Sequence, residues 1–390
     1  MRFAARSTAT ALLLASLPLA LAQSPRDPLL QAFQHPPQAA KPQTWWHWMN
    51  GNVSAAGITA DLEAMKEIGL GGAQVFNVDV GFPNGPADFM SKKWRALFAH
   101  AANESHRLGL ELAMHNCAGW SSTGGPWITP EHGMQVLAWS SLQVHGPTSF
   151  DGVLPPAKPP RVERKVDFYR DIAVFAYPTP AAETLDALVA RFRTDSWLGR
   201  SGVERQDAIN PIQSDDPATD IPAKSIQVIG RPDSRGRIAW NVPPGDWTIL
   251  RMGYTPTGVE NHPAAPSGLG LEVDKLSRDA LDSYWHHMLD KVVDDNRSVI
   301  GKGWNIVLID SYEVGTQNWS PKFREDFKAL RGYDPLPYLP AITGRIVDNS
   351  QTTDRFLWDV RRTVADLFNR NYYGYMAQLA HEHGLKFETE

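Results

Sequence analysis

The sequence has 390 residues, of which 42% are hydrophobic and 21% charged, and its formal net charge is −5. This ordinary globular composition excludes a disordered or fibrous chain, and the lack of a basic excess argues against a nucleic-acid-binding protein. The length is sufficient for about two to three domains or for one large barrel.

The first residues have the pattern of a secretory signal peptide, which we predict over residues 1–22. Two arginines precede an apolar run at residues 11–21, and residues 20–22 form a small-x-small cleavage site. We therefore expect export, to the periplasm or the medium. The apolar run is too short to cross a bilayer and no later segment is apolar enough, so the sequence predicts no integral membrane segment.

Residues 23–145 contain alternating strand and helix patterns. The predicted strands are residues 45–49, 73–76 and 110–115, and the predicted helices are residues 58–68, ended by Gly69, and 91–108, capped by Ser91 and ended by Gly109. Strands that are apolar on both faces and separated by amphipathic helices are typical of a parallel sheet. This segment predicts the first part of a (β/α) barrel.

Residues 146–275 are richer in proline and glycine and have no long helical pattern. Short strand-like runs occur at residues 171–177 and 247–254, which predicts a β-rich insertion. The second run could instead join the main sheet.

Residues 276–390 return to alternation and predict a continuation of the barrel. The predicted elements are a helix capped by Ser277, a strand at residues 305–309, a helix opened by Ser320 and Pro321, a long helix at residues 354–384 and a strand at residues 385–390. The fold class predicted is therefore α/β, an incomplete (β/α)8 TIM-type barrel with a β-rich insertion. We expect a truncated barrel, because a barrel closes only when all its strands are present.

Polar and aromatic residues follow the predicted strands at their carboxyl ends, where barrel enzymes build their sites. Those predicted to contact a ligand are His47, Trp48, Asn50, Asp79, His115, Asn116, Trp120, Asn318 and Trp319. The histidines could instead be hydrogen-bonded wall residues. The tryptophans, among fourteen in the chain, could equally be core or platforms on which sugars stack.

Asp310 and Glu313 are the candidate catalytic carboxyl groups. A carboxyl group just past an apolar strand lies in a partly desolvated position, where its pKa can rise toward the range useful for a general acid. Alternatively, Asp310 caps a loop and Glu313 pairs with a surface arginine. The sequence contains no GxSxG, HExxH or P-loop motif, and its lone cysteine, Cys117, excludes a cysteine-based zinc site.

The chain resembles glycoside hydrolase family 106, the α-L-rhamnosidases, from about Thr44 to its end. The segments that carry the resemblance are residues 45–52 (WWHWMNGN), 57–62 (GITADL), 115–122 (HNCAGWSS), 124–127 (GGPW), 310–313 (DSYE) and 318–319 (NW).

This resemblance implies a calcium-dependent enzyme that hydrolyses terminal α-L-rhamnosyl linkages of glycans or glycosides with inversion. It implies that Glu313 is the catalytic acid, that Asp310 is an acidic neighbour needed for activity, and that Glu390 is a rim residue contacting sugar or calcium. The other calcium ligands are not assigned. The second catalytic carboxylate is expected beyond residue 390.

Two other functions are compatible with the same residues. A chain without a second carboxylate could be a non-catalytic carbohydrate-binding remnant of such an enzyme. An exported barrel hydrolase of different specificity is the other alternative, since one fold hosts many chemistries.

Overall fold

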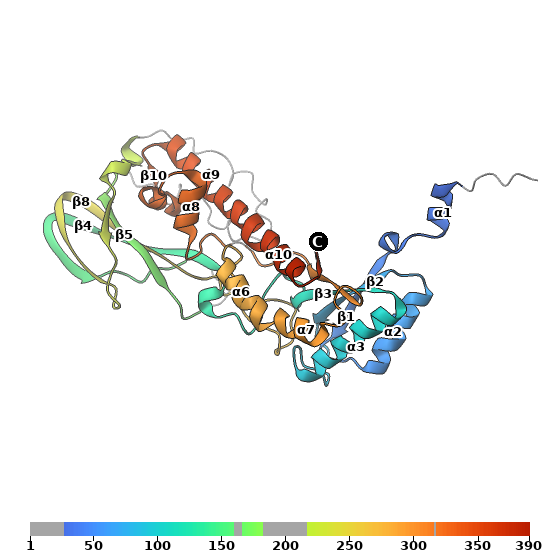
Figure 1. Cartoon of the computed structure of the whole chain (residues 1–390). Coiled ribbons are helices and arrows are strands. Elements are labelled where there is room, and N and C mark those ends of the chain that lie inside the picture. The colour runs from blue at the N-terminus through green and yellow to red at the C-terminus, as the bar shows by residue number, and fades with distance from the viewer. Residues whose placement is uncertain (1–26, 160–165, 182–216, 316) are drawn as a thin grey trace, which may run out of the picture. The chain divides into compact units, whose positions relative to one another are not determined.

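The computed structural model describes residues 27–159, 166–181, 217–315 and 317–390 (Figure 1). The predicted signal peptide lies outside these residues. The chain divides into two compact units, residues 1–41 and 42–390. In the first, the short helix α1 (Pro28–Gln34) is capped by Asp27 and followed by one 3-10 turn, Gln38–Ala40. No helix in the described part of the chain is both long enough and apolar enough to cross a membrane.

The second unit contains a parallel five-stranded sheet whose strand order is β1-β2-β3-β9-β11. Its strands are β1 (Gln43–Met49), β2 (Gly72–Val78), β3 (Glu111–Ala118), β9 (Trp304–Ile309) and β11 (Lys386–Thr389). The predicted mixed α/β class is confirmed. The sheet is open, since β1 and β11 do not pair among the described residues, and the predicted barrel is not confirmed.

Helices cover one face of this sheet, and their apolar stripes make the larger core (Figure 1). These helices are α2 (Ala55–Glu67), α3 (Lys92–Leu108), α6 (Arg278–His287) and α7 (Leu289–Asn296). The predicted caps are confirmed, because the Ser91 and Ser277 hydroxyls accept hydrogen bonds from backbone N–H groups in the first turns of α3 and α6. Gly109 ends α3 in the left-handed conformation (φ +64°) that glycine adopts at little cost.

A second sheet is antiparallel, with strand order β4-β8-β5-β7. Its strands are β4 (Gln135–Val153), β5 (Arg170–Pro178), β7 (Gln227–Gly230) and β8 (Arg237–Pro256). The run at residues 247–254 belongs to β8 and pairs with β4 and β5, so it does not join the main sheet. A two-stranded pair joins β6 (Asp220–Ile221) to β10 (Ile346–Val347).

A separate core packs on the antiparallel sheet and includes part of the segment predicted to continue the barrel. Its helical elements are α8 (Phe323–Arg331), the 3-10 helix Leu336–Thr343 and α9 (Ser350–Leu367). A π-helical stretch, Phe368–Tyr373, connects α9 to α10 (Gly374–Glu382), whose buried residues belong to the parallel-sheet core. The chain between residues 350 and 382 therefore spans both cores.

The predicted helix start at Ser320 and Pro321 is wrong. Helix α8 begins at Phe323 after Lys322, and the Ser320 hydroxyl donates a hydrogen bond to Asp274 over 2.8 Å. The Ser320 hydroxyl is buried and bonded to a distant carboxyl group, a contact that local sequence does not reveal.

Candidate active site

The carboxyl ends of all five parallel strands meet at one edge of the sheet, here called the rim. The residues that follow the strands at the rim are Asn50 after β1, Asp79 after β2, Gly119 after β3, Asp310 after β9 and Glu390 after β11. The structure therefore brings together several predicted site residues that are far apart in sequence. The acidic ones gather after β9 and β11.

Asp310 and Glu390 are neighbours across the last two strands of the sheet. Ile309 pairs with Thr389, and the Glu390 N–H donates to the Ile309 carbonyl over 3.1 Å, so the next residues lie side by side. Their carboxyl groups share a hydrogen bond. Burial, followed by the hydrogen bond and the negative charge of Glu390, raises the pKa of Asp310 to about 7.

The pKa of Glu390 moves in the opposite direction. Hydrogen bonds from Asp310 and from the Ser311 hydroxyl, which lies 3.2 Å from Oε2, lower it. Two carboxyl groups that share a hydrogen bond do not both ionise readily, so the proton of the pair resides on Asp310. Below about pH 7 the rim thus presents one protonated and one ionised carboxyl group.

Glu313 lies three residues beyond Asp310, and its side chain is 36% exposed, whereas Asp310 is only 7% exposed. The Glu313 N–H donates to the carbonyl of Ser121 over 3.3 Å, which ties this loop to the loop after β3. The ring Nε2 of His262 lies 3.9 Å from Glu313 Oε2. A half-exposed carboxyl group held by its backbone can reach a ligand without losing its position.

Ser121 links three segments of the rim although it is itself fully buried. Its hydroxyl accepts a hydrogen bond from the His262 N–H (2.8 Å) and donates one to Glu272 Oε1 (3.0 Å). Its carbonyl accepts from Glu313, as described above. Gly119, two residues earlier, permits this approach, since a Cβ atom there would lie 2.4 Å from the His262 backbone.

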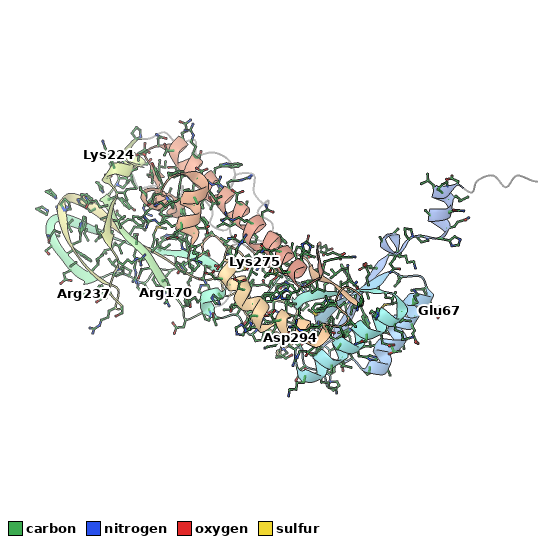
Figure 2. The ribbon with its side chains drawn as sticks, viewed as in Figure 1. Glu67, Arg170, Lys224, Arg237, Lys275 and Asp294 are labelled. Carbon is green, nitrogen blue, oxygen red and sulfur yellow. The ribbon has the colours of Figure 1, made fainter. Side chains whose placement is uncertain are left out.

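A buried ion pair holds the Glu272 carboxylate to which the Ser121 hydroxyl donates. Lys275 Nζ (Figure 2) donates to Glu272 Oε2 over 2.7 Å, and neither side chain has any exposed surface. Glu272 Oε2 also accepts from the Thr123 N–H over 3.1 Å. The rings of Tyr312 and Tyr372 lie 5.7 and 5.5 Å from the ammonium group, within the range of cation–π contacts.

Asp274 anchors the loop that carries the acidic residues. It is fully buried, and burial raises its pKa to about 6. Its carboxylate accepts hydrogen bonds from Gln317 (2.6 Å) and Ser320 (2.8 Å), while Gln317 also accepts from the Lys275 N–H (2.9 Å). The loop from Asp310 to Ser320 is therefore attached to residues 272–275 by side chains at its far end.

Sequence reasoning missed residues 262–275 as part of the site. The segment was included in the predicted β-rich insertion, and a run such as Glu272-Val273-Asp274-Lys275 looks like an ordinary exposed charged stretch. Only burial distinguishes it, and burial here depends on loops that come from distant parts of the sequence.

The sheet face opposite the helices carries predicted site residues below the rim. His47 and His115 flank Phe76, with ring centroids 5.6 and 5.2 Å from it, and Trp120 lies 6.2 Å from His47. Burial lowers the pKa of His115 to about 4 and also lowers that of His47, so His115 is neutral near pH 7. His47 is exposed and Trp120 half-buried, which leaves both accessible to a ligand.

The side chains of four other residues that were predicted to contact a ligand are buried and interact with other groups of the protein. Trp48 is 1% exposed and packs on Trp46 and Trp94, and Trp319 is 3% exposed and packs on Phe323. The remaining two are amides: Asn116 donates to Thr123 Oγ1, and Asn318 accepts from the Leu137 N–H. These side chains have no surface to offer a ligand in this structure, because they complete cores and loops.

The two remaining predicted residues shape the rim loops. Asn50 adopts a left-handed conformation (φ +46°), and its amide donates to the Phe82 carbonyl and to Asn84, both over 2.8 Å. Asp79 accepts a hydrogen bond from the Gly81 N–H over 3.0 Å and stays partly exposed.

Cys117 is buried, and burial raises the pKa of its thiol, which removes it as a nucleophile.

The residues at the rim fit a calcium ion only in part. Asp310 and Glu390 offer carboxylate oxygens side by side, which are the ligand type that calcium prefers. Among the described residues, however, no group of three histidine, cysteine or acidic side chains is placed to hold a metal.

Carboxyl groups at the carboxyl edge of a helix-covered parallel sheet lie where α/β barrel enzymes build their active sites, and comparison with known proteins gives the class of enzyme. The chain belongs to the alpha-L-rhamnosidase family, glycoside hydrolase family 106, whose sequence profile matches residues 34–390. The resemblance found in the sequence is confirmed.

Two relatives show how the chain compares with other proteins. It is 45% identical over 362 residues to a Formosa agariphila protein whose name proposes a beta-glucuronidase, covering 93% of this chain and 30% of that protein. It superimposes on a rhamnosidase from Novosphingobium sp. PP1Y with a TM-score of 0.78 and 30% identity, covering 93% of this chain and 47% of the other. The chain thus spans less than half the length of either relative.

Replacing Lys275 with methionine is expected to destabilise the fold by about 3–5 kcal/mol, because it leaves the Glu272 carboxylate buried without a counter-charge. Adding Glu272→Gln should recover part of this loss. Urea unfolding of the two variants measures both effects. Lys322→Met, which breaks the exposed Lys322–Asp279 pair, is the matched control and should change stability much less.

Replacing Glu390 with glutamine is expected to lower the pKa of Asp310 below its value of about 7, because the amide supplies no negative charge. NMR titration of protein labelled at the aspartate γ-carboxyl carbon measures this shift, with Asp279→Asn as a control at an exposed ion pair. An unchanged Asp310 titration would show that burial alone raises this pKa.

Proposed function

We propose that this chain provides the general-acid side of an exported, inverting α-L-rhamnosidase site. The observation that carries the proposal is the position of Glu313 in a family 106 chain. It is half-exposed at the rim, attached by its backbone to Ser121, and adjacent to the Asp310–Glu390 pair. The proposal includes export directed by residues 1–22, and an incomplete (β/α)8 barrel to which the five parallel strands belong.

In the proposed mechanism Glu313 gives its proton to the glycosidic oxygen as the bond to the sugar breaks. Inversion also requires a second carboxyl group about 6.5–9.5 Å away that activates water on the opposite face of the sugar. We assign Asp310 and Glu390 to holding the sugar hydroxyls rather than to water activation, because they share one proton with each other. One protonated and one ionised carboxyl group can both donate to and accept from a diol.

The resemblance to the family brings calcium into the proposal, and we expect the sugar to complete the coordination shell of the ion. With calcium bound, Asp310 would lose the shared proton, and the two carboxylates of Asp310 and Glu390 would supply oxygen ligands, which suit a hard cation. A bound ion there would fix the sugar hydroxyls in place and stabilise negative charge at the rim.

Two alternatives make different predictions. The Formosa agariphila relative, whose name proposes a beta-glucuronidase, favours a uronic acid substrate. A non-catalytic carbohydrate-binding protein would bind sugar at the rim without turnover.

The first test is release of the aryl group from an aryl α-L-rhamnoside by the purified complete gene product, with calcium or with excess chelator. We expect hydrolysis that chelation abolishes and calcium restores, and none of an aryl β-D-glucuronide. Preference for the glucuronide would overturn the rhamnosidase proposal, and full activity in chelator would remove calcium from it. Binding of rhamnose without hydrolysis of either substrate would identify the binding protein.

Replacing Glu313 with glutamine is expected to lower kcat on an alkyl or natural rhamnoside by about 10²–10⁴-fold, which is the usual contribution of general acid catalysis. Hydrolysis of a dinitrophenyl rhamnoside, whose leaving group needs no proton, should fall much less. Steady-state kinetics on the two substrates measure the difference, with Glu67→Gln on the exposed surface of α2 as the control. Equal losses on both substrates would remove Glu313 from the acid role.

A further inference from the structure

His262 occupies a specific place beside the proposed acid, and neither the family match nor the sequence analysis gives it a role. Its ring lies between two acceptor groups: Nδ1 is 3.1 Å from the Glu260 carbonyl, and Nε2 is 3.9 Å from Glu313 Oε2. The His262 side chain is 40% exposed, so its contact with Glu313 lies at the solvent-accessible surface of the rim rather than in the core.

The backbone of His262 is held more firmly than its exposure suggests. Its N–H donates to the Ser121 hydroxyl over 2.8 Å, and its carbonyl accepts from the Trp120 N–H over 3.0 Å. Because the Glu313 N–H also donates to Ser121, one buried serine sets the positions of both His262 and Glu313. The separation between the imidazole and the carboxyl group is therefore determined by the loop after β3.

The hydrogen bond to Glu260 decides which ring nitrogen faces the acid. A carbonyl oxygen can only accept, so Nδ1 carries a proton. In the charged ring Nε2 is then a donor, which suits the Glu313 carboxylate and equally the carbonyl-type oxygen of a protonated Glu313, whose O–H is left to face the leaving group. The imidazolium can thus attract Glu313 both before and after proton transfer to the glycosidic oxygen.

We propose that His262 is a positioning residue that holds the Glu313 carboxyl group in its proton-donating orientation through Nε2. This inference rests on the proposed function, in which Glu313 protonates the leaving group. His262 should therefore affect the rate of the step in which Glu313 donates its proton, since misplacing a reacting group by about 1 Å can cost up to about 10²-fold in rate.

Two amide substitutions separate this role from a structural one. In His262→Gln the terminal amide can take the place of Nε2 and face Glu313. In His262→Asn the shorter amide can take the place of Nδ1 and keep only the contact with Glu260. A positioning role predicts that the glutamine variant retains more activity than the asparagine variant, whereas a loop-tethering role predicts the reverse order.

The experiment measures kcat and KM of wild type, His262→Ala, His262→Gln and His262→Asn in the complete gene product. An alkyl rhamnoside and a dinitrophenyl rhamnoside are the two substrates. We expect His262→Ala to lower kcat on the alkyl substrate by about 10- to 10²-fold with little change on the activated one. His262→Gln should recover most of that loss and His262→Asn little of it.

The control is His145→Gln, which removes an imidazole that pairs with Asp246 on the antiparallel sheet, with 78% of its side chain exposed, and should leave both rates unchanged. Equal losses on both substrates, a change confined to KM, or better retention by His262→Asn would overturn the inference while leaving the rhamnosidase proposal intact. A wild-type protein that hydrolyses neither rhamnoside would instead overturn the proposed function, so the two failures are distinguishable.

Discussion

The buried ion pair between Glu272 and Lys275 is the constraint on which the arrangement of the rim depends. Burying two charges costs free energy that only close pairing and further hydrogen bonds can offset, and here the second carboxylate oxygen is used by the Ser121 hydroxyl. The backbone of Ser121 in turn holds Glu313. An ion pair that no ligand can reach is therefore connected to the candidate acid through two hydrogen bonds.

The antiparallel sheet contributes to the rim through the segment that follows it. Strand β8 leads into residues 257–275, and these contain His262, Asp274 and the buried ion pair. The loop after β9 is attached to the same segment through Gln317 and Ser320. The segment that follows the antiparallel sheet thus contributes side chains to the candidate site at the rim of the parallel sheet, although the two sheets have separate cores.

The acidic residues of the rim differ in charge because their surroundings differ. Burial and a neighbouring carboxylate raise the pKa of Asp310, whereas hydrogen bonds lower that of Glu390. Glu313 lies in a more exposed position three residues beyond Asp310, and the His262 imidazole is 3.9 Å from its carboxyl group. Neighbouring carboxyl groups whose environments push their pKa values apart are the usual basis for separate roles in glycoside hydrolysis.

The amino-acid sequence was enough to predict the strands of the parallel sheet, parts of β5 and β8, most of the helices with their caps, the family, and the presence of Asp310 and Glu313 at a strand end, but it did not predict β4 or β7. These features depend on local periodicity, capping and short motifs, which neighbouring residues decide. The tertiary structure, in contrast, was needed to establish that Trp48 and Trp319 belong to the core and that residues 247–254 join the antiparallel sheet. It also decided the roles of Ser121, His262 and Glu272, because burial and hydrogen bonding join residues far apart in the chain, and local sequence carries no record of those partners.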